Sequence, residues 1–171
     1  MKRLLFAVAG VLAIAGAWAF VPIRFYYREG RPTRLGRISN RLMGWWSATG
    51  LPPSFQAGLE VPGRVSGEPR TNPVVIATVG GERYLVSMLG PGSEWVRNVE
   101  AAGGRAAIRH GRRDPVTLVP VVDPAARAPV LREYCRIATS GRRHFPLAKD
   151  APLADFEAIA DRYPVYRIEL R

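Results

Sequence analysis

VVIATVGGERYLVSML, residues 74–89, has the composition of two short strands joined by a tight turn. Gly80 and Gly81 supply the positive φ angles that a two-residue hairpin turn requires. The β-branched and aromatic residues on either side of the two glycines favour strands. We therefore predict a hairpin in which Val74–Val79 pairs with Arg83–Leu89.

Short apolar runs punctuated by glycine and proline continue on both sides of this hairpin, a pattern typical of further strands. Four more strands are predicted, at Gln56–Val61, Arg105–Arg109, Val116–Val122 and Val165–Leu170, with a turn at His110–Asp114. Helices are predicted over Glu94–Ala102, from Asp123 to about Thr139, and over Leu153–Arg162. Six strands without βαβ alternation predict a mainly β fold with α elements, a small split antiparallel β-barrel with connecting helices over residues 54–171.

Charge and cysteine content argue against several classes of function. The chain carries 25 Lys and Arg against 14 Asp and Glu, and residues 1–41 hold eight of the basic residues with a single acid. Because this excess adjoins an apolar run, it indicates contact with anionic lipid rather than nucleic acid. Cys135 is the one cysteine, and His110 and His144 lack the spacing of a metal site. We expect no disulfide, no metal and no nucleic-acid partner.

The N-terminal segment reads as a membrane anchor. Leu4–Ile23 contains twenty residues without a charge, and a helix of that length spans a bilayer core of about 30 Å. Six arginines follow the run, at 24, 28, 31, 34, 37 and 41, whereas Lys2 and Arg3 precede it. By the positive-inside rule we predict that residues 1–33 form one transmembrane helix and its basic flank, with the globular domain facing the cytoplasm. A signal peptide cleaved after Ala19 is the open alternative.

Residues 34–53 are predicted to form an amphipathic helix and a linker. Leu35, Ile38, Leu42, Trp45 and Trp46 recur at helical spacing, with arginines between them. Such a basic helix carrying tryptophan can lie on lipid headgroups or pack on the domain. The sequence leaves both interpretations open.

Two segments are candidates for binding an anion. The first is Gly63–Gly67, followed by Pro69–Pro73, where Arg64, Ser66 and Arg70 offer guanidinium and hydroxyl donors on small-residue backbone. The second is Ser87–Ser93, a glycine-rich junction that leads from a strand into a helix. The first turn of such a helix presents free N–H groups to an anion. Each segment taken alone is also typical of an ordinary solvated turn.

The order of these motifs resembles the deazaflavin-dependent nitroreductase and quinone reductase family. The residues that carry the resemblance are Gly63, Arg64, Ser66, Gly67, Pro69, Arg70 and Pro73, then the hairpin glycines, then Ser87 and Gly90, then Trp95 and Asn98. It extends from about residue 57 to the C-terminus. Members of that family look like split β-barrels, which frequently pair as homodimers, bind reduced coenzyme F420 and pass hydride to nitro compounds or membrane quinones.

The resemblance implies a site that positions cofactor and acceptor, without a covalent catalytic residue. Arg64, Ser66, Arg70 and Asn72 would hold the phosphate and polyglutamate tail of the deazaflavin, with Val65 and Gly67 in the same loop. The path to the deazaflavin ring would be lined by Pro73, Ser87, Met88, Leu89, Gly90, Trp95 and Asn98. We therefore predict a membrane-anchored oxidoreductase acting on a quinone or nitroaromatic acceptor.

The sequence departs from the family pattern at three positions. Val65 and Leu89 stand where lysine is frequent, and Val96 stands where an aromatic residue is frequent. Losing two cations weakens an anion site, since each charge-assisted contact contributes about 1.5–3 kcal/mol. One alternative is thus a non-catalytic barrel that has lost the cofactor and binds a lipid or fatty acid. The weaker alternative is a related barrel that uses flavin mononucleotide.

Overall fold

The computed structural model describes residues 26–28, 31–51, 55–139 and 141–171, in two compact units, residues 1–39 and 40–171. In the first unit β1 (Tyr27–Arg28) pairs antiparallel with β2 (Arg31–Pro32). Helix α2 (Arg34–Ala48) begins in the first unit and ends in the second. Leu4–Ile23 lies outside the described residues, and no helix among those described is both long and apolar enough to cross a bilayer.

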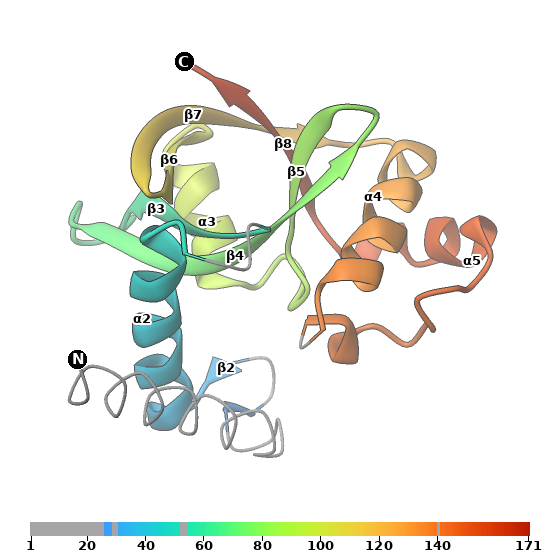
Figure 1. Cartoon of the computed structure of the whole chain (residues 1–171), viewed down its shortest axis with the longest axis horizontal. Helices are drawn as coiled ribbons and strands as arrows, with labels where there is room; N and C mark the ends of the chain where they lie inside the picture. Colours follow the sequence, from blue (N-terminus) through green and yellow to red (C-terminus); the bar gives the residue numbers. More distant parts are fainter. Residues whose placement is uncertain (1–25, 29–30, 52–54, 140) are drawn as a thin grey trace, which may run out of the picture. The chain divides into compact units, whose positions relative to one another are not determined.

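The second unit is built on a closed barrel of six antiparallel strands (Figure 1). Around the barrel the strands follow the order β3-β4-β5-β8-β7-β6. Their bounds are Gln56–Pro62 (β3), Pro69–Val79 (β4), Glu82–Val86 (β5), Arg105–His110 (β6), Arg112–Val121 (β7) and Val165–Leu170 (β8). The mainly β, six-stranded antiparallel barrel predicted from the sequence is confirmed.

The glycine hairpin is present as predicted between β4 and β5. Val79 pairs with Glu82, and Gly80 and Gly81 form the turn with φ angles of 59° and 83°. The second strand of the hairpin ends at Val86, so residues 87–89 lie beyond the strand.

Two loop predictions are wrong. β4 begins at Pro69 rather than Val74, because residues 69–73 pair with β3 in spite of their prolines and polar side chains. Proline is tolerated at the first residue of a strand, where its missing N–H costs no ladder hydrogen bond. The turn predicted over His110–Asp114 is reduced to Gly111, whose φ of 76° reverses the chain between β6 and β7.

The helices fall where the sequence predicts them, with shorter ends. α3 covers Glu94–Ala101, α4 Pro124–Ile137 and α5 Leu153–Ala158, while η2 (Gly141–His144) and η3 (Ala160–Arg162) are 3-10 turns. Asp123 caps the start of α4, because its Oδ1 accepts a hydrogen bond from the N–H of Ala125 at 3.1 Å. The last predicted helix stops early and continues as η3.

Two apolar clusters hold the barrel unit together. One joins the barrel strands to α3 and contains the fully buried Leu59, Leu85 and Leu118. The other joins β4 and β5 to α4 and α5 through Leu131 and Phe156. In Figure 1, α4 and α5 lie to one side of the barrel strands, which leaves the β3–β4 loop and α3 on another part of the barrel.

Candidate functional site

The loop between β3 and β4 is a compact turn closed by its own hydrogen bonds. The N–H of Gly63 donates to the carbonyl of Glu68 at 2.9 Å, and the N–H of Gly67 donates to the carbonyl of Gly63 at 2.7 Å. Ser66 Oγ accepts from the N–H of Glu68 at 3.3 Å and from Arg70 Nη2 at 3.4 Å. The turn thus holds Ser66 and Arg70 together, while Val65 at its tip is 91% exposed.

Arg64 fastens this loop to α3. Both its backbone N–H and its Nη1 donate to Oδ1 of Asn98, at 3.2 and 3.1 Å, and Nη1 forms an ion pair with Glu94 Oε2 at 2.7 Å. Asn98 is 6% exposed, so its amide oxygen is a buried acceptor that the loop satisfies. The loop and the helix therefore form one surface that presents Arg64 and its neighbours.

The first residues of β4 extend this surface, but only those on one of the two faces of the strand do so. Arg70 pairs with Val61 and Asn72 pairs with Leu59 across the ladder. Residues directly opposite in an antiparallel pair point to the same face, so Arg70 and Asn72 lie on the face that carries the barrel core. Side chains alternate along a strand, and the intervening residues of β4 point to the other face.

The junction between β5 and α3 is held by a triangle of oxygen atoms. Oγ of Ser87 and Oγ of Ser93 lie 2.8 Å apart, and each lies within hydrogen-bond distance of the Gly90 carbonyl, at 2.7 and 3.0 Å. Both serines are buried. Gly90 adopts a φ of 78°, which glycine permits without strain. The triangle fixes the chain direction just before α3 begins at Glu94.

The remaining predicted residues of this region contact other elements. Met88 Sδ accepts a hydrogen bond from the hydroxyl of Tyr134 on α4 at 3.3 Å. The ring of Trp95 meets the ring of Tyr166 edge-on, with centroids 5.7 Å apart. Leu89 is half-buried.

Comparison of the sequence with profiles of known protein families identifies the family of this chain. A profile of the F420H2-dependent quinone reductase family matches residues 40–141. The chain belongs to this family. Its cofactor is therefore coenzyme F420, as the resemblance implied. No curated protein matches the chain in sequence.

Several solved structures are similar to this member of the quinone reductase family. An F420-H2 dependent reductase, FDR-A, is 19% identical, with 67% of this chain and 94% of that chain covered and a TM-score of 0.45. A conserved hypothetical protein of Mycobacterium tuberculosis is 17% identical, covering 72% and 78%, with a TM-score of 0.46. A chain described as a domain-swapped dimer is 17% identical, covering 79% and 96%, with a TM-score of 0.47.

The donors of the loop fit the anionic part of F420. Among the described residues, the one hydrogen bond of the Arg70 side chain goes to Ser66, so most of its N–H donors face solvent. Arg64 uses Nη1 for Glu94 and Asn98, which leaves its other guanidinium nitrogens for a phosphate or carboxylate. Glu94 opposes this fit, because its carboxylate competes with an anion for the same guanidinium.

The predicted site residues divide into three groups in this fold. Hydrogen bonds join Arg64 to Asn98 and Arg70 to Ser66 as two pairs in the same loop region, while Asn72 shares the β4 face of Arg70. Ser87 and Gly90 belong to the turn that leads into the same helix, whereas Met88 contacts α4 and Trp95 contacts β8. Pro73 lies on the opposite face of β4, where its Cδ would be 3.6 Å from a Cβ added to Gly44 of α2.

Sequence reasoning missed the part played by Glu94. Its carboxylate binds Arg64 and also lies 3.8 Å from Arg97 Nη1. An acidic residue in the first turn of a helix is common for reasons of helix polarity alone. Thirty residues separate Glu94 from Arg64, so nothing local in the sequence marks the pair.

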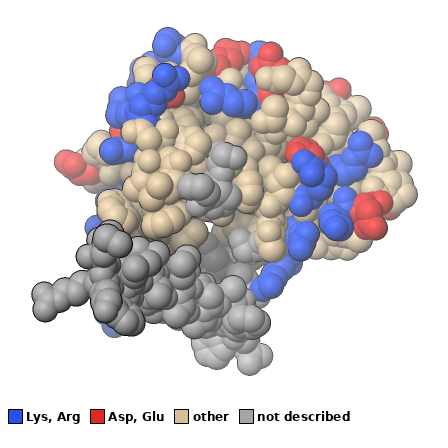
Figure 2. All heavy atoms as spheres, viewed as in Figure 1, with Lys and Arg blue, Asp and Glu red and all other residues tan. Residues whose placement is uncertain are grey.

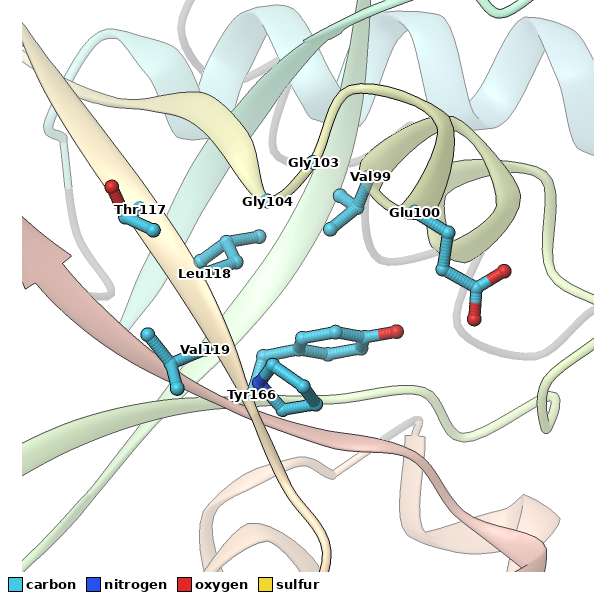
Figure 3. A pocket seen from close by; sticks show the side chains of 9 residues that line it. Val99, Glu100, Gly103, Gly104, Thr117, Leu118, Val119 and Tyr166 are labelled. Carbon is cyan, nitrogen blue, oxygen red and sulfur yellow. The ribbon is translucent and has the colours of Figure 1, made fainter.

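None of the predicted cofactor residues lines the cavity of about 380 Å³ shown in Figure 3, although Trp95 contacts Tyr166 in its wall. Val99, Leu118 and Tyr166 form much of its wall, with Glu100 beside the phenol. Burial, together with the charge of Glu100, raises the pKa of Tyr166 to about 12. The phenol is therefore protonated near neutral pH and available as a hydrogen-bond donor. The cationic donors Arg64 and Arg70 lie at the loop and are not part of this cavity's lining.

Proposed function

We propose that this chain transfers hydride from reduced F420 to a quinone or nitro-type acceptor. The observation that supports the proposal best is the double hydrogen bond from Arg64 to Asn98, because it joins the anion-binding loop to the helix that follows the glycine-rich junction. Membership of the quinone reductase family supplies the reaction class. When bound, F420 supplies the hydride, and the chain supplies position and electrostatics.

In this proposal each part of the site has a separate task. Arg64, Ser66 and Arg70 bind the phosphate and the glutamate tail, with Asn72 beside them on β4. The turn fixed by Ser87 and Gly90 presents backbone to the ring system, and Asn98 orients Arg64. Charge-assisted hydrogen bonds of this kind are about twice as strong as neutral ones, so the two arginines carry most of the affinity.

We further propose that the protein acts at the cell membrane on a lipid-soluble acceptor such as menaquinone. The supporting feature is Leu4–Ile23, twenty residues without a charge, followed by six arginines that favour a cytoplasmic position for the barrel. Proteolysis of a C-terminal tag in spheroplasts tests this orientation, because an external protease that removes the tag would contradict it. A homodimer also remains a prediction.

A second candidate function is a non-catalytic barrel that binds a lipid or fatty acid. Two observations favour it: the largely apolar lining of the cavity at Val99 and Leu118, and the exposed, uncharged tip of the loop at Val65. This protein would bind apolar ligands and show no affinity for the deazaflavin.

Turnover with reduced F420 and a menaquinone analogue separates the two candidates. The full-length chain in detergent should oxidise reduced F420, and the double variant Arg64→Ala with Arg70→Ala should raise the KM for F420 by about a hundredfold, since each charged contact contributes at least about 1.5 kcal/mol. Arg112→Ala is the matched control, because Arg112 is exposed on the β6–β7 hairpin and pairs with Asp114. Saturable fatty-acid binding without F420 binding would favour the second candidate.

A further inference from the structure

Helix α2 packs on the barrel through small residues. Gly44 and Ser47 are buried in its last three turns. A Cβ added to Gly44 would lie 3.5 Å from the carbonyl oxygen of Thr71 on β4, and one added to Gly58 of β3 would lie 3.2 Å from Cβ of Ala48. The end of the helix is tied down as well, because the N–H of Gly111 donates to the carbonyl of Ala48 at 3.0 Å.

The opposite side of α2 is apolar and exposed. Trp45 is 69% exposed and Leu42 is 54% exposed, and within the same helix Ile38 is 55% exposed. Successive residues of a helix are about 100° apart, which centres these three side chains roughly opposite the face of Gly44 and Ser47. Among the described residues, therefore, a row of large apolar side chains on this helix faces solvent. Such a row marks an interaction surface.

Arginines border this apolar row. Arg34, Arg37 and Arg41 occupy the sector of the helix next to Ile38 and Trp45, and α2 contains no acidic residue. Exposed tryptophan with flanking arginines is the chemistry of a helix that lies in a lipid headgroup layer, with the rings at the acyl boundary and the guanidinium groups on the phosphates. A protein partner would need acidic groups in register with all three arginines, whereas anionic lipids move within the bilayer and can bring negative charge to each arginine.

We propose that α2 is an interfacial helix whose row Ile38, Leu42 and Trp45 inserts at the surface of an anionic phospholipid bilayer. Its inner face already lies on β3 and β4, and the other side of β4 carries Arg70 and Asn72. Docking of α2 therefore holds the candidate site at the membrane surface, where a lipid-soluble acceptor is reached. The biological purpose rests on the proposed function, but the docking itself does not require the cofactor.

Site-directed bimane fluorescence in the full-length chain, reconstituted in vesicles, tests the proposal. Cysteine is introduced at Leu42, at Trp45, at Met43 on the side of the same helix, and at the exposed Val122 of the barrel as the matched control. Cys135 contributes little background, because its thiol is buried. In vesicles of phosphatidylcholine and phosphatidylglycerol, brominated acyl chains should quench positions 42 and 45 more than 43, and leave 122 unquenched.

Charge removal supplies the second arm of the experiment. The triple change Arg34→Gln, Arg37→Gln and Arg41→Gln should lower the docking equilibrium about a hundredfold, at about fivefold per arginine, and pure phosphatidylcholine should act in the same direction. Equal quenching at 42, 43 and 45, or free access of aqueous iodide to position 45, overturns the proposal. Shielding of position 45 that depends on protein concentration but not on lipid overturns it too, because a second copy then covers the row. Because docking does not require the cofactor, neither result bears on the affinity for F420, which is measured separately.

Discussion

Asn98 is the residue whose replacement tests the union of loop and helix most sharply. Its buried Oδ1 accepts from the N–H and from Nη1 of Arg64. A neutral hydrogen bond contributes about 1 kcal/mol net and one to a charged group about 1.5–3 kcal/mol. The Arg64 side chain is 32% exposed and keeps Glu94, so water and the carboxylate offset part of the second contribution. Asn98→Ala should therefore lower the free energy of unfolding by about 2 kcal/mol.

The effect on F420 binding has an upper limit set by the same contacts. In the variant, F420 must order the loosened loop when it binds. The binding free energy therefore falls by at most the contribution of the contacts between Arg64 and Asn98, and the Kd should rise by no more than about thirtyfold. Thermal unfolding and quenching of tryptophan fluorescence measure the two quantities on the full-length chain. Asn98→Asp is the matched variant, because it keeps the acceptor oxygens for Arg64 but adds a negative charge that repels the anion. If Asn98→Ala leaves both stability and Kd unchanged, the loop and the helix do not act as one site.

Three further outcomes follow from single residues. Gly103→Ala should lower the free energy of unfolding by about 1 kcal/mol, because the residue has a left-handed backbone. Gly104→Ala should lower it by about 3 kcal/mol, because the added Cβ would also lie 2.7 Å from the carbonyl oxygen of Leu118. Thermal unfolding measures both changes. Burial opposes ionisation of Glu60, but hydrogen bonds from two arginines hold its pKa below the usual value; the wild type should thus lose stability as pH falls from about 5 through that lowered pKa, and Glu60→Gln should flatten this slope. Burial raises the pKa of Cys135 to about 11, so maleimide should label it at neutral pH only as fast as the protein unfolds.

Local sequence patterns predicted much of the fold correctly. Gly80 and Gly81 located a hairpin because a two-residue turn demands positive φ, and Asp123 located the start of α4 because its side chain caps the first turn. Local composition also explains the main error. Residues 69–73 look like a loop, yet they form a strand because their backbone pairs with residues 58–62 of β3.

The candidate site was predictable only as separate pieces. The arginine loop and the glycine-rich junction are visible in the sequence, but the contact of Arg64 with Asn98 joins residues 34 positions apart and depends on how the barrel closes. The orientation of Pro73 toward α2 likewise follows from the register of β4 with β3. On the face shown in Figure 2, acidic side chains lie among the basic ones, so charge alone would not have located the site.

The most direct measurement of the central claim is a comparison of two ligands on two proteins by calorimetry. One ligand is F420 and the other is the same deazaflavin without its phosphate and glutamates. Wild type should prefer F420 by about a hundredfold, and the double variant Arg64→Ala with Arg70→Ala should bind both ligands alike, because the two arginines grip only the anionic part. Undiminished preference for F420 in the double variant would contradict the assignment of the cofactor site to this loop.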